Sequence, residues 1–267
     1  MRNFVKLMLA SLLVLAMAFA LVGCGGQADN EAQSDNGTAT EVKKLVVGTN
    51  ATFPPFEMQE SSGELTGFDM ELIRAIGEVQ GYEVEIKHMD FKALVPSVQG
   101  GKIDAAIAGM SITPERLESV DFTDAYFDAG LIIAVHKDNQ DIKSTEDLKG
   151  KKLAAQNGTI GAAYCDGVKK EEASTEVRIF DDIGLAFIEL EKGGVDAVVN
   201  DYPVTANYIE TTEDTNVMMV GEMFSADDQY GIAVKKGNTE LLEMLNEGLA
   251  KIKENGTYDE IYNKWIK

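Results

Sequence analysis

The hydrophobic pattern of the chain changes at about Lys44, where short apolar runs begin to alternate with amphipathic segments. Runs rich in β-branched residues predict strands at 45–48, 84–86, 103–108, 131–135, 152–155, 177–180 and 195–199. Segments with one apolar helical face predict helices at 69–79, 161–173, 185–192, 240–251 and 258–265. This alternation indicates an α/β protein with largely parallel sheets, in which ligands bind beyond the carboxyl ends of the strands.

One segment occurs twice in similar form. Both "GGKIDAAIAGMSITPER", from Gly100, and "GGVDAVVNDYPVTANY", from Gly193, contain glycines that can cap a helix, then a buried strand, a polar loop and a helix that starts with proline. The repeat predicts two lobes of similar architecture. Such a joint between helix and strand is also common in α/β proteins in general, so this alternative stays open.

The chain is expected to cross between the two lobes twice. Segment 128–138 is predicted to carry it out of lobe 1, and segment 222–237 to carry it back. Lobe 1 then comprises 43–132 and 224–267, and lobe 2 comprises 133–223. Two crossings of this kind form a hinge, and the cleft between lobes is a usual place for a small ligand.

The N-terminus has the pattern of a signal peptide. Arg2 and Lys6 precede an almost unbroken apolar run, and the predicted signal peptide is 1–23. It ends in Leu-Val-Gly before Cys24, which resembles a bacterial lipobox and predicts a lipidated Cys24; an ordinary signal peptide with an incidental cysteine is the alternative. Residues 24–42 are small and polar, which predicts a flexible tether. The protein is therefore expected outside the cytoplasm, lipid-anchored to the cell membrane.

Charge and cysteine content narrow the choice of partners. The 267 residues carry a net charge of −21, which becomes −23 without residues 1–23, so the protein should avoid nucleic acid and anionic lipid surfaces. With Cys24 lipidated, Cys165 is the only other cysteine, and no intramolecular disulfide can form. There are two histidines and no recognisable hydrolase, metalloprotease or nucleotide-binding motif. These features predict a protein that is not an enzyme and that uses no cofactor or metal.

The stretch "GMSITPER" contains a candidate anion site. Thr113 and Pro114 predict a helix start, which puts Arg116 in the first turn, where the helix dipole disfavours a cation. An arginine fits there if it shares the turn with a carboxylate. Gly109 allows close backbone approach, and the hydroxyl of Ser111 lies beside it in sequence. An exposed Arg116 that reaches a nearby acid is the alternative.

The second copy of the repeat offers the opposite charge. In "VVNDYP", Asp201 comes just after a buried strand, where its carboxylate could accept hydrogen bonds from an ammonium group. Asp201 could instead cap the helix that begins near Pro203. An arginine on one lobe and an aspartate on the other would together detect a zwitterion, and an α-amino acid is the smallest common metabolite of that shape.

The chain from about Lys44 to Lys267 resembles the extracytoplasmic solute-binding proteins of polar amino acid ABC transporters. The resemblance is carried by "LVVGTNATFPPFE", "GFDMELIRAI", "MDFKALVPSVQGGKIDAAIAGMSITPERLESVDFTDAY", "DLKGKKLAAQNGT", "GGVDAVVNDYP", "YGIAVKKGN" and "ENGTYDEIYNKW". It implies a two-lobed periplasmic-binding-protein-like fold of type II, in which two hinge crossings join lobes that are each a mostly parallel sheet flanked by helices. It also implies a monomer that delivers its ligand to an ABC transporter permease.

The resemblance also implies the roles of individual residues. Arg116 would hold the ligand α-carboxylate, Asp201 would take the ammonium, and two aromatic rings would sandwich the side chain. For those rings, core packing is the alternative. The expected ligand-binding residues are Asn50, Phe53, Phe91, Gly109, Ser111, Arg116, Gln156, Thr159 and Asp201.

Asn50 departs from the pattern of relatives that carry an aspartate there, which weakens the case for a cationic ligand. The rings of Phe53 and Phe91 can still hold a guanidinium, and Glu57 or Asp90 are expected near enough to help. Arginine or lysine is slightly preferred, with glutamine as the alternative. A less favoured alternative is an enzyme that resembles cyclohexadienyl dehydratases, for which the sequence identifies no general acid or base.

Overall fold

The computed structural model describes residues 43–266. The predicted signal peptide, the lipidation of Cys24 and the 24–42 tether lie outside these residues. Within the described part, no helix has the length and the apolar character needed to cross a membrane.

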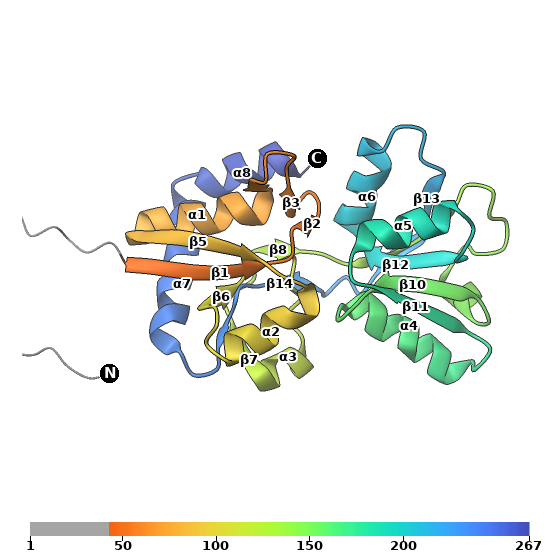
Figure 1. Ribbon diagram of the computed structural model, residues 1–267, viewed down its shortest axis with the longest axis horizontal. Helices are drawn as coiled ribbons and strands as arrows, with labels where there is room; N and C mark the ends of the chain where they lie inside the picture. Colours follow the sequence, from red (N-terminus) through yellow and green to blue (C-terminus); the bar gives the residue numbers. More distant parts are fainter. Residues whose placement is uncertain (1–42, 267) are drawn as a thin grey trace, which may run out of the picture. The chain divides into compact units, whose positions relative to one another are not determined.

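The first lobe is built on a five-stranded sheet with the order β5-β1-β6-β15-β7 (Figure 1). Its strands are β1 (Lys43–Thr49), β5 (Tyr82–His88), β6 (Ala105–Ala106), β7 (Val120–Phe122) and β15 (Ala233–Lys235). Its helices are α1 (Phe68–Gln80), α2 (Phe91–Gln99), α3 (Pro114–Ser119), α7 (Thr239–Glu254) and α8 (Thr257–Trp265). A small sheet of β2 (Thr52–Phe53), β3 (Glu57–Gln59) and β4 (Leu65–Thr66) precedes α1.

The second lobe repeats this plan with the strand order β11-β10-β12-β9-β13. Its strands are β9 (Leu131–His136), β10 (Lys152–Gln156), β11 (Glu176–Phe180), β12 (Ala197–Asp201) and β13 (Val217–Phe224). Its helices are α4 (Ile160–Glu171), α5 (Ile183–Glu191) and α6 (Tyr202–Thr211), and a 3-10 turn, η1, spans Thr145–Leu148. The α/β class and the two lobes expected from the sequence are confirmed.

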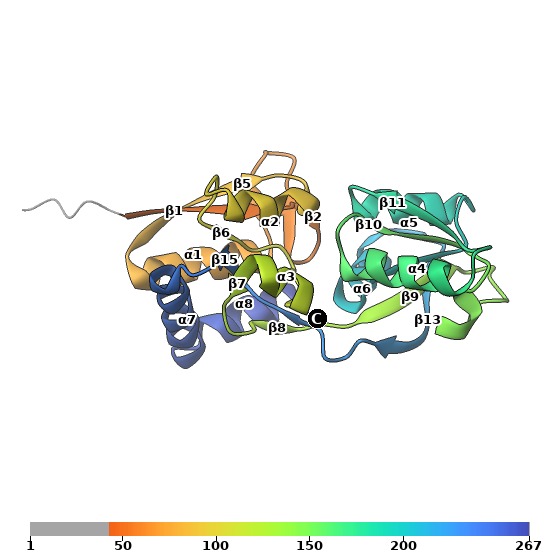
Figure 2. The same ribbon diagram turned by 90° about the horizontal axis from the view of Figure 1, so that it is seen from below.

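In each sheet, three neighbouring parallel strands are followed by one reversed strand and then by a fifth. The reversed strands, β9 and β15, are those through which the chain enters each lobe. They follow β8 (Phe127–Asp128) and β14 (Gln229–Tyr230), which pair with each other in antiparallel fashion. Figures 1 and 2 show the two connections between the lobes at this pair. The predicted pair of crossings is therefore present, and it explains the single reversed strand in each sheet.

The sequence repeat has the same hydrogen bonds in both lobes. In the first lobe, the Val46 N–H donates to the Asp104 carboxylate over 2.8 Å, and the Asp104 N–H donates back to the Val46 carbonyl over 2.8 Å. In the second lobe, the Lys152 N–H donates to Asp196 over 2.7 Å, and the Asp196 N–H donates back over 2.7 Å. The aspartate of each copy thus joins a strand start to the neighbouring strand, which confirms that the two segments are structurally equivalent.

Two of the longer elements, α2 and β13, were not expected from the sequence pattern, and neither were the short strands β2, β3, β4, β7, β8, β14 and β15. Pro96 inside α2 removes a backbone donor and argues against a helix there, but the helix keeps a buried apolar face. In β13, Gly221 has a positive φ of 73° and lies where the pairing with β9 shifts register. The predicted strand 103–108 is shorter in the structure, because only Ala105–Ala106 has strand geometry.

Candidate functional site

A cavity lies where side chains of the two lobes meet, beyond the carboxyl ends of β6, β10 and β12. Its lining residues are Phe53, Phe91, Ala108, Gly109, Ser111, Arg116, Gln156, Thr159, Ile160 and Asp201. Eight of these were expected from the sequence, and the ninth expected residue, Asn50, accepts a hydrogen bond of 2.8 Å from Gln156. Ala108 and Ile160 were missed, because nothing in an apolar residue beside a strand or helix end marks it as part of a site.

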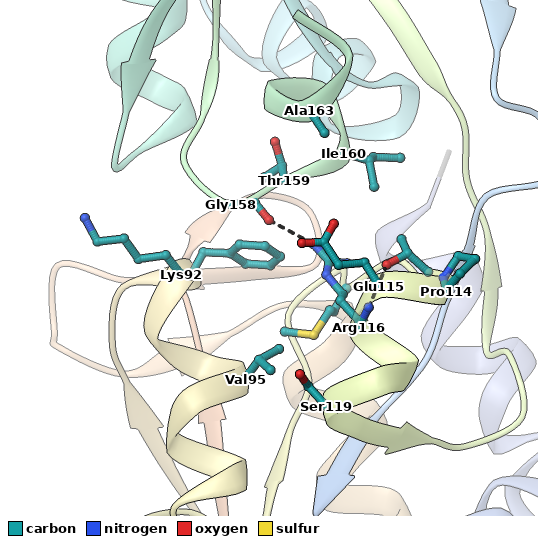
Figure 3. Close-up of a pocket in the computed structure, with 13 residues that line it drawn as sticks. Lys92, Val95, Pro114, Glu115, Arg116, Ser119, Gly158, Thr159, Ile160 and Ala163 are labelled. Atoms are coloured by element: carbon teal, nitrogen blue, oxygen red, sulfur yellow. Dashed lines mark hydrogen bonds between the residues drawn. The ribbon is translucent and has the colours of Figure 1, made fainter. Parts of the chain in front are cut away.

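A larger pocket of about 560 Å³ adjoins this cavity (Figure 3). Phe91, Arg116, Thr159 and Ile160 line both spaces, so these four side chains form the boundary between them. The volume lies within the range usual for small-molecule sites, about 300–1,000 Å³. The two spaces together form the candidate site.

Arg116 reaches from the first lobe to the second. The Thr113 hydroxyl accepts from the Arg116 N–H over 3.2 Å, which confirms the predicted helix start. The guanidinium donates to the Ser111 carbonyl over 2.5 Å and to the Gly158 carbonyl over 3.0 Å (Figure 3), and it lies 5.3 Å from the centroid of the Phe91 ring. It therefore uses two carbonyls of the site rather than a nearby surface acid.

The surroundings of Arg116 are acidic. Burial lowers the pKa of Arg116, while the charges of Asp201 and Asp228 raise it. Asp228 was missed by the sequence analysis, although it lies in the predicted crossing 222–237. Asp228 is 8 % exposed, and burial raises its pKa while Ser111 and Arg116 lower it. The helix α3 has only six residues, so the guanidinium, not a helix dipole, must supply most of the attraction for an anion.

Asp201 lies at the end of β12 and is 4 % exposed. It occupies the N-cap position of α6, but its side chain makes no capping hydrogen bond. Its carboxylate instead accepts from the Tyr230 hydroxyl. Burial raises the pKa of Asp201 to about 7, against the opposing effects of the Tyr230 hydrogen bond and the Arg116 charge. The alternative role as a helix cap is therefore wrong for the side chain.

Gly109 brings the backbone close to an aromatic ring. Its φ is +50°, and a Cβ built on it would lie 3.0 Å from Phe53 Cε1. Its N–H donates to Asp69 over 2.8 Å. Phe53 and Phe91 line the cavity and also belong to buried apolar clusters, so site and core roles coexist in both rings.

The other end of the site is built from amides. Gln156 Nε2 donates to Asn50 Oδ1 over 2.8 Å and to the Asp181 carbonyl over 3.1 Å. Asn50 Nδ2 donates to the Met89 carbonyl over 3.1 Å. Nearby, Lys92 Nζ lies 3.0 Å from the Asp181 carboxylate and lowers the pKa of that group.

The structure does not place Glu57 or Asp90 among the residues that line the site. Glu57 is fully buried, and Asp90 is the exposed N-cap of α2. Neither lines the cavity or the larger pocket. Glu57 is nevertheless close enough to the site for the charge of Asp201 to raise its pKa.

Thr159 is the N-cap of α4. Its hydroxyl accepts from the Ala162 N–H over 3.2 Å and donates to the Gln156 carbonyl over 2.8 Å. The first N–H groups of a helix have no partner within the helix and favour anions. The start of α4 lines the same pocket as the Arg116 guanidinium (Figure 3). Its free N–H groups are therefore a second place where an anion can bind.

The arrangement defines a binding protein of the two-lobed, solute-binding class. Residues 45–267 match the family described as "Bacterial extracellular solute-binding proteins, family 3", and the chain belongs to this family. It is 36% identical over 275 residues to the ABC transporter glutamine-binding protein GlnH of Bacillus subtilis (strain 168), covering 100% of this chain and 98% of that protein. It is 35% identical over 233 residues to the ABC transporter arginine-binding protein 1 of Escherichia coli (strain K12), covering 85% and 93%.

Solved structures agree with this assignment. An ancestral arginine-binding protein bound to arginine is 49% identical, has a TM-score of 0.81, and covers 84% of this chain and 98% of its own. An ancestral arginine-binding protein bound to glutamine is also 49% identical, with a TM-score of 0.79 and coverage of 83% and 97%. An ancestral amino-acid-binding protein, a precursor of cyclohexadienyl dehydratase, is 39% identical with a TM-score of 0.75 and coverage of 84% and 96%. These likenesses confirm the expected type II fold.

Proposed function

We propose that this protein binds a polar L-amino acid between its lobes and delivers it to the permease of an ABC transporter. The observation that carries the proposal is that Arg116 from the first lobe and Asp201 from the second line one cavity. A guanidinium and a carboxylate on opposite sides of a small space match the two charges of an amino acid zwitterion.

In this proposal the ligand carboxylate lies between the Arg116 guanidinium and the start of α4. Ser111 and Thr159 border the same space. The ligand ammonium donates to Asp201, whose carboxylate has one oxygen engaged by Tyr230. Because the partners come from both lobes, the ligand stabilises the closed arrangement, and closure is a hinge motion at the two crossings.

The side chain of the ligand lies between Phe53 and Phe91 and points toward the Asn50–Gln156 amide pair. Arg116 already lies over the Phe91 ring, so that ring accepts cations, which supports the slight preference for arginine or lysine. The amide pair supports glutamine, the second candidate, because amides of this kind can both donate and accept. The similar structures bound to arginine and to glutamine support both candidates equally.

The proposal also includes the expected processing, membrane anchoring and lobe limits of the chain. Signal peptide 1–23 is removed, Cys24 is lipidated, and the 24–42 tether links the anchor to a monomeric two-lobed body. We propose the lobe limits 43–132 with 224–267 for the first lobe and 133–223 for the second.

A thermal-shift screen of protein lacking residues 1–24 against all common L-amino acids tests the function. A ligand that binds only the folded state stabilises it by about 2.7 kcal/mol at one hundred times its dissociation constant. We expect shifts with arginine or lysine, whereas a screen led by glutamine would identify the amide pair as the specificity determinant. The Arg116→Met variant should lose the response, while Arg178→Met, at the Arg178–Glu189 ion pair, should keep it. No shift with any amino acid would contradict the proposal and favour the dehydratase-like alternative.

A further inference from the structure

Two buried acids, Glu57 and Asp69, lie behind the wall of the candidate site. Both are 0% exposed. Gly67 brings their backbones together, because a Cβ at this position would lie 2.2 Å from the Phe56 carbonyl oxygen and 3.0 Å from the Glu57 Cα. The Asp69 N–H donates to the Phe56 carbonyl over 2.9 Å, which fixes β3 against the first turn of α1. The chain therefore holds Glu57 and Asp69 on adjoining backbone segments in the core.

One oxygen of Asp69 is fully used. Oδ2 accepts from the Gly109 N–H over 2.8 Å and from the Tyr126 hydroxyl over 2.8 Å. Asp69 also lies in the first turn of α1, where the helix dipole stabilises a negative charge. Asp69 is thus the carboxyl group of the pair that is best able to carry a charge.

The other carboxyl oxygens of this pair, Asp69 Oδ1 and both oxygens of Glu57, are buried without a hydrogen-bond donor among the N–H and hydroxyl groups of the described residues. Glu57 and Asp69 lie on adjoining backbone segments, and a hydrogen bond between their side chains contributes to the pKa of each. Two ionised carboxylates cannot face each other in a dry core, whereas one retained proton converts the repulsion into a hydrogen bond.

The distribution of that proton follows from the surroundings. Burial raises the pKa of Glu57 well above its ordinary value, and the charges of Asp69 and Asp201 raise it further. Burial raises the pKa of Asp69 only to about 6, because hydrogen bonds with Gly109, Glu57 and Tyr126 lower it. At neutral pH, Glu57 is the neutral acid and Asp69 the carboxylate.

We infer that Glu57 donates its proton to Asp69, and that this carboxyl pair is a positioning device that fixes the Gly109 peptide in the wall of the site. The inference rests on the proposed function only in so far as Gly109 contacts the ligand. Glu57 compensates the second oxygen of Asp69, and Asp69 holds the Gly109 N–H and the Tyr126 hydroxyl. The left-handed conformation of Gly109, which sets the direction of its carbonyl, is thereby held from behind.

Infrared spectroscopy at pH 7 tests the proton directly and needs no ligand. A protonated carboxylic acid has a carbonyl stretch at higher frequency than the amide band. Asp201 has a pKa of about 7 and is partly protonated at pH 7, so every protein compared also carries Asp201→Asn. In this background the protein with Glu57 should show the band, and Glu57→Gln should lose it, whereas Glu64→Gln, at an exposed position, should keep it. Identical spectra with Glu57 and with Gln at this position would overturn the inference.

Hydrogen exchange of the Gly109 amide, followed by NMR, tests the positioning role. Glu57→Met has a similar size but no donor, and it should raise the Gly109 exchange rate at least tenfold while amides of the second lobe keep theirs. Glu57→Gln restores a donor toward Asp69 and should recover most of the protection. Unchanged Gly109 exchange in Glu57→Met would overturn the positioning role; should Glu57→Met fail to fold, the comparison of Glu57→Gln with Glu57 in the Asp201→Asn background decides by the infrared band. Because neither readout uses an amino acid, failure of the ligand screen would leave both results interpretable.

Discussion

The raised pKa of Asp201 makes a quantitative prediction about stability. The native state keeps the Asp201 proton up to a pKa of about 7, whereas the ordinary value is 3.8. Between these values the native state binds more protons than the unfolded chain, so the free energy of unfolding falls as pH rises and becomes flat above pH 7. For a carboxyl group with these two pKa values, the loss between pH 5 and pH 8 is about 2–3 kcal/mol.

The Asp201→Asn variant removes this titration and keeps an acceptor for the Tyr230 hydroxyl. The free energy of unfolding of the variant minus that of wild type should therefore rise by about 2–3 kcal/mol between pH 5 and pH 8. Any pH-independent change in stability caused by the amide leaves this rise unaffected. Urea unfolding followed by the fluorescence of Trp265, the one tryptophan in the sequence, measures the difference at each pH. Asp69 also titrates near this range, but it is present in both proteins and cancels.

The control is Asp227→Asn, which removes the same charge from an exposed position. Its stability profile should run parallel to that of wild type. If Asp201→Asn also ran parallel to wild type, Asp201 would have an ordinary pKa, and the argument from its burial would be refuted.

The same proton should control ligand affinity. The proposed ammonium partner is ionised Asp201, so the protein must release the Asp201 proton to bind below its pKa of about 7. The affinity for the amino acid found in the screen should then rise by up to about tenfold per pH unit between pH 5 and pH 7. Calorimetry in buffers of different ionisation enthalpy would detect the released proton. An affinity independent of pH would exclude Asp201 as the ammonium partner.

Three further predictions concern separate features. Arg116→Ala should weaken ligand binding by about 2–4 kcal/mol, because a desolvated carboxylate would lose its charged donor; calorimetry that shows less than a tenfold loss would contradict this role. Asp104→Ala and Asp196→Ala should each lower the free energy of unfolding by about 0.5–1.5 kcal/mol in urea titrations, and a large effect in one lobe alone would contradict their equivalence. Cys165, buried and with a pKa raised to about 12, should react with a thiol reagent only after unfolding, so rapid reaction of the native protein would disprove its burial.

The sequence predicts those parts of the fold that depend on local patterns. Apolar runs mark β1, β10 and β12 because buried parallel strands need them on both faces. Arg116 and Asp201 are visible in the sequence because each charge stands at the edge of a buried segment, where a carboxyl strand end is expected. These signals need only neighbouring residues.

The rest of the site depends on contacts between distant parts of the chain. Asp228 becomes buried beside Arg116 only because the returning crossing pairs with β8. The Asn50–Gln156 hydrogen bond joins residues 106 positions apart, and Glu57 becomes buried beside α1 because Gly67 lets the chain next to β3 approach closely. No local pattern contains this information, so acids that looked alike in the sequence have different positions in the structure.

The two copies of the repeat share a scaffold but differ in charge, and this difference carries the proposed specificity. Equivalent aspartates, Asp104 and Asp196, hold both scaffolds in the same way. Beyond the following strand, the first copy presents a cation, Arg116, and the second presents an anion, Asp201, to one cavity. A single-signed ligand would leave one of these buried charges without an opposite charge, held only by neutral groups such as the Tyr230 hydroxyl or the Gly158 carbonyl. A buried charge that lacks an ionic partner is costly. Opposite charges on equivalent edges therefore select ligands that carry both signs. The residues that line the cavity between Arg116 and Asp201 then determine which ligand side chain is accepted.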